Sequence, residues 1–195
     1  MKLIMATGNA NKVREMREML EGSGIEIMSL KEAGIDAEII ENGKTFEENA
    51  LIKAKTIRDI AHETVFADDS GLEIDYLEGA PGVHSSRFMG EDTPYDIKNA
   101  QILRRLEGVP EDKRSARFIC AIAIAYADGS TKTFRGVFEG RIAYEAAGEN
   151  GFGYDPIFYV PEKGCTSAQL FPDEKNAISH RGQALKAAMK ELLGE

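Results

Sequence analysis

The sequence has few cysteines, no long apolar run and no excess of positive charge, and each shortage excludes a class of protein. Only two cysteines occur in 195 residues, Cys120 and Cys165, and no CxxC spacing is present. A disulfide framework or a zinc site is therefore not expected, both cysteines are interpreted as packing residues, and a reducing cytoplasm fits. No apolar run approaches the length of a membrane span, and residues 1–4 begin a strand-like segment without a signal-peptide core.

The charge balance is acidic. The formal net charge is −9 at pH 7, from 24 basic and 33 acidic residues. Affinity for a nucleic-acid backbone needs clustered Lys and Arg, so bulk nucleic-acid binding is not expected, although one local basic pocket for a polyphosphate stays open. With 43% hydrophobic and 29% charged residues, the composition is that of a globular protein. Residues 1–195 fit one domain, or one domain with two lobes, and are long enough for a substantial core.

Helical and strand patterns alternate along the chain, without repeats or low-complexity linkers. Periodicity predicts helices near residues 11–21, 45–62, 95–106 and 179–193, and strands near residues 2–6, 25–30, 65–67, 117–126 and 131–138. Thr45 and Glu48 have the spacing of a capping box, and Asp128-Gly129 indicates a hairpin between the last two strands. The alternation, with one hairpin, predicts an α/β protein with a mixed sheet.

The stretch Asp68-Asp69-Ser70-Gly71 carries the strongest chemical signal. It follows an apolar strand, and Ser70-Gly71 is interpreted as the turn that ends this strand, although residues 72–76 could extend it. Because side chains alternate between the faces of a strand, the two carboxylates should not both reach one site if the strand stays regular. They serve either a metal-assisted reaction or the backbone N–H groups of the turn.

A second motif joins the first strand to the first helix, with residues Thr7, Gly8, Asn9, Ala10, Asn11 and Lys12. The free N–H groups and the positive dipole end of such a junction suit phosphate, and Lys12 adds a mobile charge. The Walker A spacing is absent, and an ordinary capped turn is the commoner interpretation of this motif taken alone.

A third cluster places Phe152 between Gly151 and Gly153. Glycines beside an aromatic ring allow close backbone approach to a flat ligand, so Phe152 could stack on a base while Asp155 or the backbone bonds the base edge. The alternative is a turn between strands, with Phe152 and Tyr154 packed in the core.

A fourth cluster lies at the start of the last predicted helix. Ser179 can cap this helix, which places His180 and Arg181 in its first turn, where positive charge opposes the helix dipole. The opposed charge indicates a partner such as a nucleotide, or a neighbouring carboxylate. Together with Lys175, three donors within seven residues favour ligand binding over a solvated surface.

Taken together, these segments resemble the inosine/xanthosine triphosphate pyrophosphatase family nearly from end to end. The resemblance rests on Thr7-Gly8-Asn9 with Lys12, Phe46 with Asn49-Ala50 and Lys53-Ala54, residues 68–72, residues 79–82 with Ser85 and Arg87, residues 151–156, and Ser179-His180-Arg181. One position departs from the family pattern, because an aromatic residue often stands where this chain has His84.

The resemblance implies a long mixed sheet flanked by helices, two lobes with a central cleft, and a homodimer. It implies hydrolysis of ITP, dITP and XTP to the monophosphate and pyrophosphate with Mg²⁺. The implied magnesium ligands are Glu41 and Asp69, and Asp69 is also the implied general base. The implied substrate contacts are Thr7, Gly8, Asn9, Ala10, Asn11, Lys12, Lys53, Ser70, Phe152, Gly153, Tyr154, Asp155, Lys175, His180 and Arg181.

Elementary chemistry agrees with these roles and leaves one question open. Mg²⁺ prefers a few carboxylates, phosphate oxygens and retained waters, and the lysines can neutralise a triphosphate. A carboxylate bound directly to Mg²⁺ is a poor base because the cation lowers its pKa. Either Asp69 contacts the metal through water, or Asp68 or Glu41 shares the roles of metal ligand and general base with it.

Two other functions remain possible from the sequence. Maf-type pyrophosphatases have a related fold but prefer modified pyrimidine or 7-methylguanine triphosphates. The segments around Phe152 and His180 argue against this class. A non-catalytic nucleotide sensor could use the same pocket. The carboxylates Glu41, Asp68 and Asp69 speak against a sensor, because negative charge near a triphosphate helps only if a metal bridges it.

Overall fold

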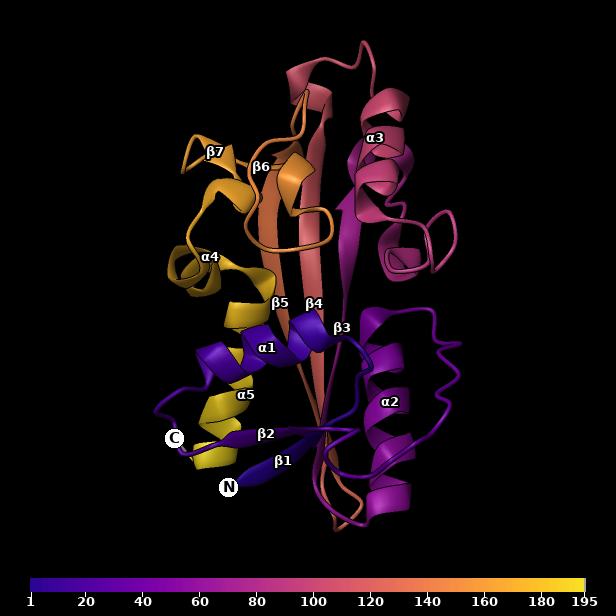
Figure 1. Ribbon diagram of the computed structural model, residues 1–195, viewed down its shortest axis with the longest axis vertical. Helices are drawn as coiled ribbons and strands as arrows, with labels where there is room; N and C mark the ends of the chain where they lie inside the picture. Colours follow the sequence, from indigo (N-terminus) through magenta and orange to yellow (C-terminus); the bar gives the residue numbers. More distant parts are fainter. Residues whose placement is uncertain (195) are drawn as a thin grey trace. The chain divides into compact units, whose positions relative to one another are not determined.

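The computed structural model describes residues 1–194 (Figure 1). The helices are α1 (Ala10–Met19), α2 (Phe46–Ala61), α3 (Tyr95–Arg105), α4 (Pro172–Ile178) and α5 (His180–Leu193). The strands are β1 (Lys2–Met5), β2 (Glu26–Ser29), β3 (Val65–Ile74), β4 (Ser115–Ala125), β5 (Thr131–Ile142), β6 (Phe158–Val160) and β7 (Cys165–Thr166). None of the helices in the described part of the chain is long and apolar enough to cross a membrane.

The strands form one seven-stranded sheet in the order β2-β1-β3-β4-β5-β6-β7. Strand β1 runs parallel to β2 and β3, whereas β6 runs antiparallel to β5 and β7. The predicted α/β class with a mixed sheet is therefore confirmed. The predicted hairpin is also present, since β4 and β5 are neighbours and the N–H of Tyr126 donates to the carbonyl of Ser130.

The chain divides into two compact units, each with its own hydrophobic core. Unit 1 contains Met1–Asp69, Cys120–Gly136 and the chain from Ala184 onward, and unit 2 contains Ser70–Ile119 and Val137–Gln183. Strands β3, β4 and β5 contribute residues to both units. The central cleft expected from the sequence stays a prediction.

In unit 1, helices cover both faces of the strands (Figure 1). Helices α1 and α5 pack on one face, where Met16 and Leu185 meet Phe66 of β3 in one apolar cluster. Helix α2 lies on the other face, and its Ala54 and Ile57 are fully buried. Because side chains alternate along β3, successive residues of this strand face different helices.

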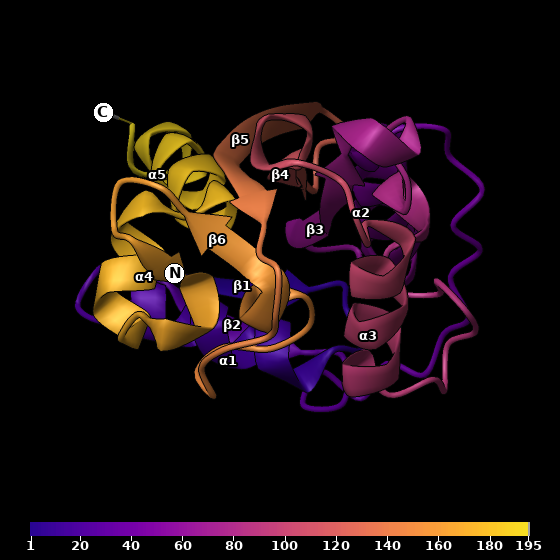
Figure 2. The same cartoon turned by 90° about the horizontal axis from the view of Figure 1, so that it is seen from above.

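In unit 2, helices α3 and α4 lie apart with β6 between them (Figure 2). The core joins Ile102 and Leu106 of α3 to Phe138 of β5 and Phe158 of β6. Gly182 lets α5 begin close to α4, because a Cβ at this position would lie 1.9 Å from the carbonyl oxygen of Asn176. The close start of α5 places the residues that follow Ser179 beside the end of α4.

One prediction about local structure is wrong, and one helix was missed. The turn predicted at Ser70-Gly71 does not exist, because β3 continues to Ile74 and buries Leu72 and Ile74 in the core of unit 2. Helix α4 was not predicted, because its seven residues are too few to show an apolar period. Ser179 caps α5 as predicted, since its Oγ accepts the N–H of Gly182 at 3.1 Å.

Candidate active site

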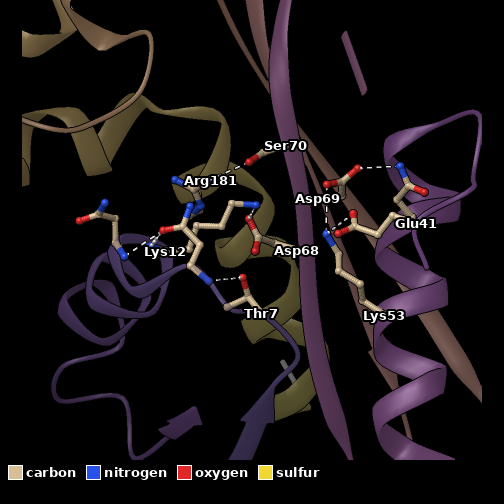
Figure 3. Close-up of polar contacts among 11 residues, drawn as sticks. Thr7, Lys12, Glu41, Lys53, Asp68, Asp69, Ser70 and Arg181 are labelled. Atoms are coloured by element: carbon tan, nitrogen blue, oxygen red, sulfur yellow. Dashed lines mark hydrogen bonds and ion pairs between the residues drawn. The ribbon is translucent and has the colours of Figure 1, made fainter. Parts of the chain in front are cut away.

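The two adjacent carboxylates of β3 point to opposite sides of the strand (Figure 3). Asp68 lies on the side of α1, where its Oδ2 is 3.0 Å from Nζ of Lys12. Asp69 lies on the side of α2, where its Oδ1 is 3.1 Å from Nζ of Lys53. The predicted divergence of the two side chains is therefore confirmed, and the turn that they were alternatively expected to bind is absent, since β3 continues through Ser70 and Gly71.

Lys53 is the centre of a buried charged cluster in unit 1. Its Nζ lies 2.9 Å from Oε2 of Glu41 and 3.1 Å from Oδ1 of Asp69, although only 6% of the residue is exposed. Asn49, one helical turn earlier on α2, donates from Nδ2 to Oδ2 of Asp69 at 3.2 Å. Asn49 and Lys53, four residues apart on α2, therefore share the face of the helix that binds Asp69.

Burial and charge act in opposite directions on the pKa values of this cluster. Burial alone would lower the pKa of Lys53, but the neighbouring carboxylates, Asp69 foremost, outweigh burial and raise it. Burial also raises the pKa of Asp69, against the opposing charges of Lys53 and Lys12. Lys53 therefore stays charged, while Asp69 becomes easier to protonate than an ordinary aspartate.

Asn49 also holds the loop that carries Glu41. Its Oδ1 accepts the N–H of Gly43 at 2.8 Å. A Cβ at Gly43 would lie 2.6 Å from this same oxygen, so the close approach requires glycine. Sequence reasoning noted Asn49 as part of a motif but did not place it in the site, because its contact with Asp69 spans 20 residues.

The loop from Thr7 to Lys12 is capped by its own side chains in this structure. Oδ1 of Asn9 accepts the N–H groups of Asn11 at 3.0 Å and of Lys12 at 3.3 Å. Oγ1 of Thr7 accepts the N–H of Asn9 at 3.2 Å. Thr7 and Gly8 also border a groove of about 920 Å³ formed with residues 29–37. An anion at this helix start would compete with Asn9 for two N–H groups.

In unit 2, Arg181 joins Ser70 to the ring of Phe152. Its Nη2 donates to Oγ of Ser70 at 2.9 Å, and its guanidinium carbon lies 5.6 Å from the ring centre of Phe152. Nζ of Lys175 lies 5.3 Å from the same ring centre. The structure therefore brings together four residues that the sequence predicted as nucleotide contacts.

Asp155 organises the loop around Phe152. Its Oδ2 accepts from the N–H of Phe152 at 2.9 Å and from Nζ of Lys175 at 2.7 Å, and its Oδ1 accepts from the hydroxyl of Ser167. The residue is 2% exposed. A Cβ at Gly151, which has φ of 72°, would lie 2.2 Å from Oδ2 of Asp155. Both oxygens of Asp155 thus bind the protein itself in this structure.

His180 packs on an aromatic ring of β4. Its ring centre lies 4.9 Å from that of Phe118, with 16° between the planes, and the histidine is 5% exposed. Sequence reasoning missed Phe118 and Ser167 as parts of the site. Neither stands in a motif, and each meets its partner only in the folded chain.

The described residues hold no group of three or more His, Cys, Asp or Glu side chains that could bind a metal ion. Glu41 and Asp69 nevertheless share one positive charge, the ammonium of Lys53. A pair of carboxylates around one cation fits Mg²⁺, which usually takes one or two protein carboxylates and completes its shell with phosphate oxygens and water. These two residues are the candidates for holding a divalent ion.

Comparison with known proteins gives full-length matches. A sequence profile of the Ham1 family matches residues 3–191. A dITP/XTP pyrophosphatase from Exiguobacterium sibiricum is 50% identical over 198 residues, covering 100% of both chains. One from Bacillus subtilis is 49% identical over 189 residues, covering 97% of this chain and 96% of its own. The structure of a HAM1 protein from Coxiella burnetii superposes with a TM-score of 0.89 at 42% identity, covering 100% of both chains.

Proposed function

The chain belongs to the Ham1 family, and on this premise we propose that it is a nucleoside triphosphate pyrophosphatase for non-standard purine nucleotides. It hydrolyses ITP, dITP and XTP to the nucleoside monophosphate and pyrophosphate. The observation that carries this proposal is the buried cluster of Lys53, Glu41 and Asp69. A metal-bound triphosphate needs carboxylate ligands for the metal and positive charge for the phosphates, and this cluster supplies both.

Glu41 and Asp69 hold the divalent ion, which is Mg²⁺. When bound, the ion neutralises phosphate charge and favours departure of pyrophosphate. Lys12, at the end of the Thr7 loop, and Lys53 supply the further positive charge that the triphosphate needs. In this structure each lysine binds a carboxylate instead, so the substrate competes with Asp68 for Lys12 and with Glu41 and Asp69 for Lys53.

Asp69 acts as the general base and would contact the ion through water, because direct coordination would lower its pKa. Burial raises its pKa, which makes it a better proton acceptor than an ordinary aspartate. The water oxygen bonds to a phosphorus of the α–β anhydride, the bond to the bridging oxygen breaks, and the water proton passes to Asp69. Asp68 instead positions Lys12, because its carboxylate is fully buried and lies on the opposite side of β3.

The purine base is recognised in unit 2. Phe152 provides the stacking surface, and Arg181 provides donors for the 6-carbonyl group that hypoxanthine and xanthine share. Adenine carries an amino group there, so its donors would meet donors, at a cost of about 1–3 kcal/mol per buried unpaired group. Lys175 and Asp155 hold the ring of Phe152 in place.

A substrate panel tests this proposal against the Maf-type alternative. The panel contains ITP, dITP, XTP, ATP, GTP, 5-methyl-UTP and 7-methyl-GTP, with pyrophosphate and orthophosphate measured separately. Fast pyrophosphate release from ITP, dITP and XTP is expected. Preference for the methylated nucleotides, or orthophosphate as the product, would overturn the proposal. A cytoplasmic homodimer also remains a proposal from the family resemblance, and light scattering of the purified protein tests the assembly.

A further inference from the structure

Ser85 connects strand β3 to the loop that carries Phe152. It is 4% exposed and belongs to the chain segment that joins β3 to α3. Its Oγ accepts the N–H of Leu72 at 2.9 Å, two residues beyond Ser70 on the strand. Its carbonyl oxygen accepts the hydroxyl of Tyr154 at 2.6 Å. One residue therefore bonds both to the strand that presents Ser70 and to the loop that presents Phe152.

Helix α3 holds the same loop from a second direction. Nδ2 of Asn99, a residue 4% exposed, donates to the carbonyl oxygen of Gly153 at 3.1 Å. The ring of Tyr95 packs by its edge against the ring of Tyr154, with centres 5.2 Å apart and planes at 89°. Gly153 has φ of 68°, a conformation that suits glycine and that these contacts help to fix.

We propose that Ser85 and the hydroxyl of Tyr154 are positioning residues for base recognition. The inference rests on the proposed function, which places the purine on Phe152. Arg181 binds Ser70 and lies over Phe152, so base recognition requires that strand and loop keep a fixed separation. The link through Ser85 sets this separation. It also gives a role to Ser85 of the motif formed by residues 79–82, Ser85 and Arg87, because no step of the proposed reaction uses this serine.

Tyr154→Phe is the test variant, because it removes the hydroxyl and keeps the ring. The buried carbonyl of Ser85 then loses its donor and the loop can shift. The KM for ITP should rise about fivefold to tenfold, with kcat within about twofold of wild type. The ratio of kcat/KM for ITP over ATP should fall. Tyr95→Phe is the matched control, since it removes a hydroxyl from the neighbouring ring and leaves the link intact.

A merely structural role predicts a different kinetic result. If the link only stabilised the fold, Tyr154→Phe would reduce the folded fraction, so apparent kcat would fall while KM and the ITP-to-ATP ratio stayed unchanged. That result would overturn the proposal. Ser85→Ala removes the Oγ that accepts the N–H of Leu72, so it breaks the link on the side of strand β3. It should reproduce the KM increase of Tyr154→Phe. An unchanged KM in Ser85→Ala would also count against it.

Amide hydrogen exchange provides a readout that does not depend on activity. The N–H of Phe152 is bonded to Asp155 only while the loop keeps its conformation. Its exchange should be faster in Tyr154→Phe than in wild type or Tyr95→Phe. Equal exchange in all three proteins would overturn the positioning role even if ITP hydrolysis were confirmed. Failure of wild type to hydrolyse ITP would instead overturn the proposed function.

Discussion

The Nζ atom of Lys53 lies 3.1 Å from Oδ1 of Asp69, inside a cluster that also includes the carboxylate of Glu41. The ammonium group thus occupies the place between two carboxylates where a divalent cation would be most strongly attracted. We expect a metal ion that enters without nucleotide to displace Lys53. A metal ion that enters with a triphosphate brings phosphate oxygens that can take over Lys53. Metal and nucleotide should therefore bind cooperatively.

Lys53→Met tests this cooperativity. Without Lys53, the buried carboxylate of Asp69 and the partly exposed carboxylate of Glu41 lack this counter-charge, and a divalent ion can replace it. In the absence of nucleotide, the variant should bind Mn²⁺ about tenfold or more tightly than wild type, since about 1.4 kcal/mol of relieved competition suffices. Mn²⁺ should also raise its Tm. Lys55→Met changes an exposed lysine of the same helix and should behave as wild type. Equal Mn²⁺ affinity in all three proteins would contradict the prediction.

The pH dependence of kcat/KM follows from the raised pKa of Asp69. Protonated Asp69 cannot accept the water proton, so kcat/KM for ITP should fall as pH drops through a value above the usual 3.8 of aspartate. Lys53 lowers the pKa of Asp69, so Lys53→Met should move this fall to higher pH. Comparing variants on one substrate cancels the titration of the phosphates. An unmoved profile would show that Asp69 does not set the acidic limb.

The buried pair of Asp155 and Lys175 should contribute to stability as a unit. Their side chains are 3% and 6% exposed and 2.7 Å apart. Asp155→Asn or Lys175→Met leaves one buried charge uncompensated and should cost about 3–5 kcal/mol of unfolding free energy. The double variant should lose less than the sum of the two, as measured by equilibrium unfolding in urea. Additive losses would mean that the two groups are not coupled.

Gly43→Ala should weaken the activation of the enzyme by Mg²⁺, with little loss in the free energy of unfolding. The new methyl group would lie 2.6 Å from Oδ1 of Asn49, so the loop must move and take Glu41 with it. The Mg²⁺ concentration for half-maximal activity should rise severalfold. Asn42→Ala, at an exposed neighbouring position, is the control. An unchanged Mg²⁺ requirement would argue against Glu41 as a ligand.

Local signals in the sequence predicted much of the fold. Thr45 begins α2 as its spacing predicts, with Oγ1 accepting the N–H of Glu48 at 3.1 Å. The other half of the capping box differs, because the carboxylate of Glu48 binds the N–H of Lys44 instead. The Ser70-Gly71 turn was predicted wrongly because turn propensity is local, whereas β3 is extended by burial of Leu72 in a core built from distant segments.

The candidate site was predictable in part. Alternation along β3 predicted that Asp68 and Asp69 diverge, but not which lysine each would bind. The link from Ser85 to Tyr154 spans 69 residues, and no local pattern predicts a contact of that separation. The raised pKa of Asp69 could not be predicted from the sequence either, because its largest cause is burial in the folded chain.

The most direct test of the account is the rate of pyrophosphate release from ITP with Mg²⁺ by Asp69→Asn and Asp68→Asn beside wild type. Loss of a general base costs about 10²–10⁴-fold in rate, so Asp69→Asn should lose kcat on this scale. Asp68→Asn should change mainly the KM for ITP and leave kcat near that of wild type, because Asp68 contacts Lys12 and not the attacking water. Near-normal kcat in Asp69→Asn, with the large loss in Asp68→Asn, would contradict the assignment of the chemistry to the α2 side of β3.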